Sequence, residues 1–166
     1  MQQFAALFTA LDQTTKTNAK VAALAAYFLN APEDDRLWTI ALLSGRRPKR
    51  TITVSKLREW AAERAGIPQW LFEESYPIVG DLAETIALVL PEPSSRSTLS
   101  LTAWITAIKA LAAEDEDVRK AQILAAWDGL DRRERFVFNK LITGGFRVGV
   151  SQKLMTRALS KATGIE

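Results

Sequence analysis

The segment FAALFTALDQTTKTNAKVAALAAYF, residues 4–28, predicts the fold class of this chain. Apolar residues recur in it at intervals of three and four, at Phe4, Leu7, Phe8 and Leu11 and again at Val21, Leu24, Ala25 and Phe28. This is the spacing of one face of an amphipathic helix. The same periodicity continues along the chain, and alternation of period two is confined to residues 51–54. The sequence therefore predicts an all-α fold of about ten to twelve helices.

Signals for helix ends agree with the periodicity. Asp131 with Glu134 has the spacing of a capping box, and a serine begins a helical pattern at Ser55 and at Ser151. Gly66 and Gly164 follow helical patterns in the place of a glycine cap.

The composition excludes several classes of active site. The chain of 166 residues has no His and no Cys, so it cannot form Ser-His-Asp or Cys-His sites or the usual zinc sites. Its 22 Lys and Arg residues against 19 Asp and Glu are too small an excess to identify a partner. No signal peptide and no apolar stretch long enough for a membrane span is visible. We expect a cytoplasmic monomer without a membrane segment or a metal site.

An internal repeat organises the sequence. Residues 4–27 align with residues 104–127, and after a one-residue gap residues 35–45 align with residues 134–144. Any two amphipathic helices can align by chance, but the matching order and loops favour a duplication. The prediction is one domain, 1–166, in which two pseudo-two-fold related copies of a four-helix unit, about 3–67 and 101–166, are joined by helices and a linker at 68–100. The place where the second copy stops suggests a longer parent protein.

Positive charge is concentrated at equivalent places in the two copies. Residues 46–58 carry six basic residues and no acid, and residues 140–165 carry five and no acid. Either run alone is typical of a solvated surface, but two basic loops that contain glycine suit the two backbones of a nucleic-acid duplex. Amides at the helix starts near Ser55 and Ser151 can bind phosphates there.

The aromatic residues have two interpretations. The five Trp residues fall mostly on apolar helical faces, and core packing is the favoured interpretation for each. Phe146 lies inside the loop GGFRVGV, residues 144–150, beside Arg147. It either fills the core beneath this loop or lies against a sugar in a minor groove, and the sequence leaves both open.

Three motifs in the right order resemble ATP-dependent DNA ligases. The stretch LITGGFRVGVSQKLMTRALSKATGI, residues 141–165, is similar to the signature at the end of their N-terminal DNA-binding domain. IVGDLAETIAL, residues 78–88, is similar to that domain's Gly-Asp-Leu element, and the opening helix, residues 4–24, also matches. The resemblance covers essentially the whole chain and is closest to the bacterial enzymes.

The resemblance implies an all-helical domain that binds nicked double-stranded DNA through the minor groove, mainly at phosphates and sugars, without reading sequence. In the parent ligase it would complete a ring around DNA with nucleotidyltransferase and OB-fold domains that this chain lacks, acting in DNA repair, recombination or replication at the nucleoid. The implied contacts lie in the turn after the first helix (Lys16, Asn18, Lys20), the first basic loop (Ser44, Gly45, Arg46, Arg47, Lys49, Arg50) and the second-copy loop (Gly144, Gly145, Phe146, Arg147, Gly149, Ser151). The first loop lacks two glycines of the second, so we expect its contacts to come from long side chains.

Adenylation chemistry is not expected in this chain. A ligase attacks ATP with the Lys of a Lys-x-Asp-Gly motif, but Ala126 stands at the Lys position before Asp128 and Gly129. We therefore expect no enzyme activity, cofactor or metal here, and ATP and magnesium only in the catalytic domains of the parent. The alternative function is a helical protein-interaction scaffold whose basic loops bind an acidic partner.

Overall fold

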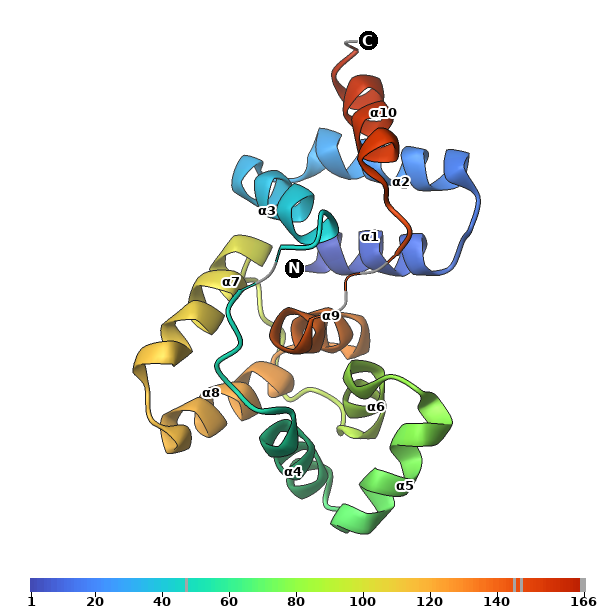
Figure 1. The fold of residues 1–166 in the computed structure, drawn as a ribbon. Coiled ribbons are helices and arrows are strands. Elements are labelled where there is room, and N and C mark those ends of the chain that lie inside the picture. Colours follow the sequence, from blue (N-terminus) through green and yellow to red (C-terminus); the bar gives the residue numbers. More distant parts are fainter. Residues whose placement is uncertain (47, 145, 147, 165–166) are drawn as a thin grey trace. The chain divides into compact units, whose positions relative to one another are not determined.

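The computed structural model describes residues 1–46, 48–144, 146 and 148–164 (Figure 1). In this part of the chain there are ten α-helices, one short 3₁₀ helix and no strand, which confirms the predicted all-α class. None of the described helices is long and apolar enough to cross a membrane. The helices are α1 (Gln2–Asp12), α2 (Thr17–Asn30), α3 (Glu33–Leu43), α4 (Val54–Ala65), α5 (Gln69–Val79), α6 (Leu82–Val89), α7 (Leu101–Ala110), η1 (Leu111–Ala113), α8 (Glu116–Asp128), α9 (Arg132–Thr143) and α10 (Gln152–Thr163).

The chain forms two compact units that are not continuous in sequence. Unit 1 consists of residues 1–47, 100–103 and 145–166, and unit 2 consists of residues 48–99 and 104–144. Unit 1 therefore contains α1, α2, α3 and α10, whereas unit 2 contains α4, α5, α6, α8, α9 and most of α7. The last helix of each predicted copy belongs to a different unit from the first three helices of that copy.

Unit 1 is built on α2, which packs against both α1 and α10. Figure 1 shows the C-terminal helix α10, in red, beside α2, in blue. A buried polar chain joins α2 to α3, because the Thr39 hydroxyl lies within hydrogen-bond distance of the Tyr27 hydroxyl (2.7 Å) and of the Asp35 carbonyl (2.8 Å) and donates its single proton to one of them at a time. Burial raises the pKa of Tyr27 to about 12. The phenol therefore ionises less readily than a solvent-exposed tyrosine.

Unit 2 is organised by the packing of α6 against α9. Asn139 of α9 is fully buried, and both ends of its amide are bonded. Its Nδ2 donates to the carbonyl of Ala83 on α6 (3.1 Å), and its Oδ1 accepts from Trp127 Nε1 on α8 (2.8 Å). One amide thus joins three helices of this unit.

The helix ends follow the predicted signals with one correction. The Asp131–Glu134 capping box is present, and Gly66 ends α4 in the left-handed conformation (φ +71°). The prediction that Ser55 begins α4 is wrong. Thr53 is the extended residue before the helix, and its Oγ1 accepts from the Lys56 amide (3.3 Å), which leaves Ser55 inside the first turn.

The prediction of core packing for the Trp residues is correct for three of them. Trp60, Trp104 and Trp127 are buried, Trp38 is half-buried, and Trp70 is 66% exposed. The reason is that α5 turns Phe72 inward, and Phe72 has no exposed surface. One inward aromatic residue anchors this helix, so its neighbour two positions away faces solvent.

Asn139→Ala should lower the free energy of unfolding by about 3 kcal/mol, because it removes two hydrogen bonds of a fully buried amide and leaves the Trp127 indole N–H buried without the acceptor it has here. Urea denaturation measures the change. The matched control is Asn30→Ala on exposed α2 surface, where the amide donates to the Ala26 carbonyl and to no other described residue, and it should stay within about 0.5 kcal/mol of the parent chain. Equal losses in the two variants would contradict the role given to Asn139.

Candidate nucleic-acid interface

Unit 1 brings the predicted turn after α1 next to the start of α10. Lys16 is exposed at the N-terminal end of α2, where no side chain caps the helix among the described residues. The Asn18 side-chain oxygen accepts from Nη2 of Arg157 on α10 (3.3 Å). Ser151 begins α10, and its hydroxyl accepts from the Leu154 amide (3.1 Å). Two predicted contact segments far apart in sequence therefore meet on one unit.

Lys20 differs from the other residues of this turn because its side chain is inside the unit. It is 8% exposed, and its Nζ donates to the carbonyl oxygens of Val148 (2.7 Å) and Gly149 (3.3 Å). The structure thus places Lys20 beneath the second-copy loop rather than on its outer surface.

The first basic loop begins where α3 ends. Ser44 ends this helix, and the exposed Gly45 has a φ of +97°, a conformation that favours glycine. Arg46, Lys49 and Arg50 are exposed. Arg46 and Lys49 form no ion pair with a described residue. Arg50 donates from Nη2 to the Thr143 carbonyl at the end of α9 (3.0 Å), a place where a cation is favoured.

Several cations of the two basic runs are paired with acids in unit 2. Lys56 Nζ lies 3.6 Å from Glu59 and 3.7 Å from Glu116. Arg58 Nη1 lies 3.5 Å from Glu73 Oε2. The guanidinium carbon of Arg58 lies over the Tyr76 ring, 5.0 Å from the ring centroid. Lys140 pairs with Asp81, which also caps α6. Exposed cations without an acid partner in the described part of the chain include Lys16, Arg46, Lys49 and Lys153 at the loops and helix starts. Others lie on α9 and α10, at Arg132, Arg133, Arg157 and Lys161.

The second-copy loop packs its aromatic residue inward. Phe146 is 8% exposed and meets Phe4 and Phe8 edge to face, with ring centroids 5.9 and 5.5 Å apart. Of the two interpretations left open by the sequence, the structure selects core packing. Gly144 ends α9 with a φ of +89° and is buried. Arg47, Gly145 and Arg147 lie outside the described residues.

Two exposed cations that lie beside a predicted contact residue are absent from the predicted site. Lys153 and Arg157 are exposed on α10, four residues apart, so they share one helical face next to Asn18. The spacing of two cations at i and i+4 directly after the serine cap was the available signal.

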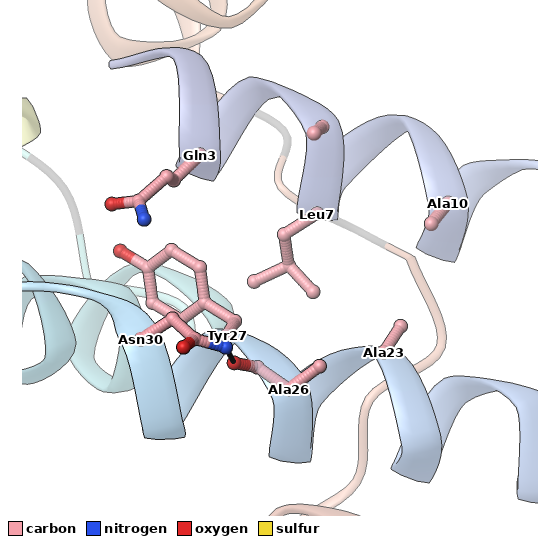
Figure 2. Close-up of a pocket in the computed structure, with 8 residues that line it drawn as sticks. Gln3, Leu7, Ala10, Ala23, Ala26, Tyr27 and Asn30 are labelled. Atoms are coloured by element: carbon pink, nitrogen blue, oxygen red, sulfur yellow. Dashed lines mark hydrogen bonds between the residues drawn. The ribbon is translucent and has the colours of Figure 1, made fainter.

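The groove between α1 and α2 does not resemble a phosphate site. It has a volume of about 320 Å³ and is lined by Gln3, Leu7, Tyr27, Asn30 and several alanines (Figure 2). No charged residue is among the described residues that line it. Nor does the described part of the chain bring three or more Asp and Glu side chains together as metal ligands.

The comparison with known families identifies the class of this chain. A family model described as the DNA ligase N terminus matches residues 1–160, and the chain belongs to that family. No curated protein matches it. The family is the non-catalytic N-terminal part of ATP-dependent DNA ligases, so this chain is not the catalytic domain.

Phe146→Ala should lower the free energy of unfolding by about 3 kcal/mol, because it removes a buried ring that packs on two others. Trp70→Ala, which removes a 66% exposed aromatic ring, should change it by less than about 0.5 kcal/mol. Chemical denaturation of both variants makes the comparison. If Phe146→Ala kept full stability and weakened binding to DNA instead, the ring would belong to the groove-facing interpretation.

Proposed function

We propose that this chain binds nicked duplex DNA without reading its sequence, as the DNA-binding domain of an ATP-dependent DNA ligase. The observation that carries the proposal is the set of exposed cations without acid partners at the loops and helix starts of a ligase N-terminal domain. Contacts to phosphates position a protein on DNA and carry no sequence information directly. The acids of unit 2 neutralise Lys56, Arg58 and Lys140, which leaves positive charge where the chain turns.

The described residues fit phosphate binding in two ways. No described side chain caps the start of α2, so its first amides and the Lys16 ammonium can share an anion. Arg46 and Lys49 extend from a loop that no described acid covers, and long flexible cations suit the backbone of the minor groove. We infer that Asn18, Ser44, Gly45 and Ser151 contribute shorter contacts near these cations.

In the parent enzyme, which we infer to be of the bacterial type, this domain would encircle DNA together with the nucleotidyltransferase and OB-fold domains. The parent would act in repair, recombination or replication at the nucleoid. ATP and magnesium would be used in the catalytic domains alone, and the isolated chain would be a monomer without a cofactor. Binding of an acidic protein by the basic loops is the competing outcome in the experiments that follow.

A titration of the chain with labelled duplexes of increasing length, nicked and intact, at several salt concentrations tests the function. Neutralisation of one phosphate by each of Lys16, Arg46, Lys49 and Lys153 gives a slope of log affinity against log salt of about −3.6 or steeper. We expect affinity to rise until the duplex exceeds one helical turn. A chain that bound no duplex at low salt would contradict the proposal and favour an acidic protein partner.

Two lysines of the same basic run give a matched test of the contact residues. Lys49→Met should make the salt slope shallower by about 0.9, because Lys49 is exposed without an acid partner among the described residues. Lys56→Met removes the same charge, but Lys56 is already paired with Glu59 and Glu116, so it should leave the slope unchanged. Equal changes in both variants would show a general effect of net charge and would contradict the assignment.

A further inference from the structure

Lys20 holds the last part of the second-copy loop from below. Its ammonium is buried and donates to two successive carbonyls, those of Val148 and Gly149. No described carboxylate pairs with it. A buried ammonium needs hydrogen-bond partners, and these carbonyls supply them. The ammonium therefore restrains the course of the main chain at this point.

Gly149 is fitted to this contact by its lack of a side chain. Its φ is +68°, and a Cβ placed on it would lie 2.5 Å from Lys20 Nζ. Any other residue would be strained at this φ and would also displace the ammonium. Two residues later Ser151 caps α10, so Lys20 fixes the chain immediately before the helix start.

Arg119 makes comparable contacts to the main chain in unit 2, although its neighbour Lys120 is the residue that aligns with Lys20 in the repeat. From α8 its Nη1 donates to the Thr51 carbonyl (2.8 Å), while Nε and Nη2 donate to the carbonyls of Leu111 (2.8 Å) and Ala112 (3.2 Å). Thr51 stands two residues before Thr53, the cap of α4, as Gly149 stands two residues before Ser151. In each unit a long cation therefore bonds the main chain at the same distance from a capped helix.

We propose, on the basis of the DNA-binding function above, that Lys20 and Arg119 are positioning residues that fix the main chain before α10 and α4 and do not themselves contact DNA. The donors of both side chains are directed to carbonyls within the protein. A cation used in this way releases no counterion from a phosphate. The proposal replaces the predicted DNA contact of Lys20 with support of the loop that makes contacts.

The test in unit 1 compares Lys20→Met with Lys16→Met, which remove the same charge from the same turn. Lys20→Met should weaken DNA binding about tenfold with an unchanged salt slope, because it loses bonds from a charged donor but no phosphate contact. Lys16→Met should make the slope shallower by about 0.9. A slope that became shallower in Lys20→Met as well would overturn the proposal.

A second readout needs no DNA. Order parameters of the Val148 and Gly149 amides should fall from about 0.85 towards 0.6 in Lys20→Met and should stay unchanged in Lys16→Met. Unchanged order parameters in Lys20→Met would overturn the proposal. Loss of order in a chain that binds no DNA would support the positioning role while refuting the proposed function. If Lys20→Met does not fold, Lys20→Gln removes the same charge and should likewise leave the salt slope unchanged.

In unit 2, neighbouring residues of α8 provide the matched pair. Arg119→Met should lower the order parameter of the Thr51 amide, since it removes the donor to the Thr51 carbonyl. Lys120→Met removes the same charge but only an exposed pair with Glu63 (2.8 Å), so it should leave Thr51 unchanged. Equal behaviour of the two variants at Thr51 would refute the role of Arg119.

Discussion

The packing of α10 against α2 is the contact on which the candidate interface in unit 1 depends. It joins residues at opposite ends of the sequence and buries Leu154, Met155 and Ala158 of α10. Because α10 is held there, Arg157 reaches Asn18, and the loop before α10 comes within reach of Lys20. The turn after α1 and the residues just before α10 stay next to each other only as long as this helix pair is intact.

The two units repeat one physical arrangement with different side chains. In unit 1 the Tyr27 phenol on α2 bonds Thr39 on α3, and in unit 2 the Trp127 indole on α8 bonds Asn139 on α9. Both pairs are buried, but the repeat alignment places Thr39 opposite Phe138, so the two bonds are similar in kind without joining equivalent positions. The fourth helix of each predicted copy packs in the other unit. Such an exchange makes the copies interdependent, because neither keeps its own fourth helix.

Local signals predicted the helices well because their causes lie within a few residues. The apolar period, the Asp131–Glu134 box and the Gly66 cap were readable for this reason. Contacts between residues far apart in sequence could not be predicted in this way. Nothing near Lys20 shows that carbonyls more than 120 residues away receive its ammonium, so the sequence suggested an exposed contact. Pairing of Lys56 with Glu116 and exposure of Trp70 likewise depend on which helices become neighbours.

The central claim concerns the exposed cations at the loops and helix starts that have no acid partner among the described residues. These cations bind DNA, and the acidic helices α5 and α6 do not. Titration of the ¹⁵N-labelled chain with a nicked duplex, followed by amide chemical shifts, tests it most directly. The account predicts shifts at Lys16, Asn18, Arg46, Lys49 and Ser151 that disappear at high salt. Shifts concentrated on α5 and α6, or shifts insensitive to salt, would contradict it.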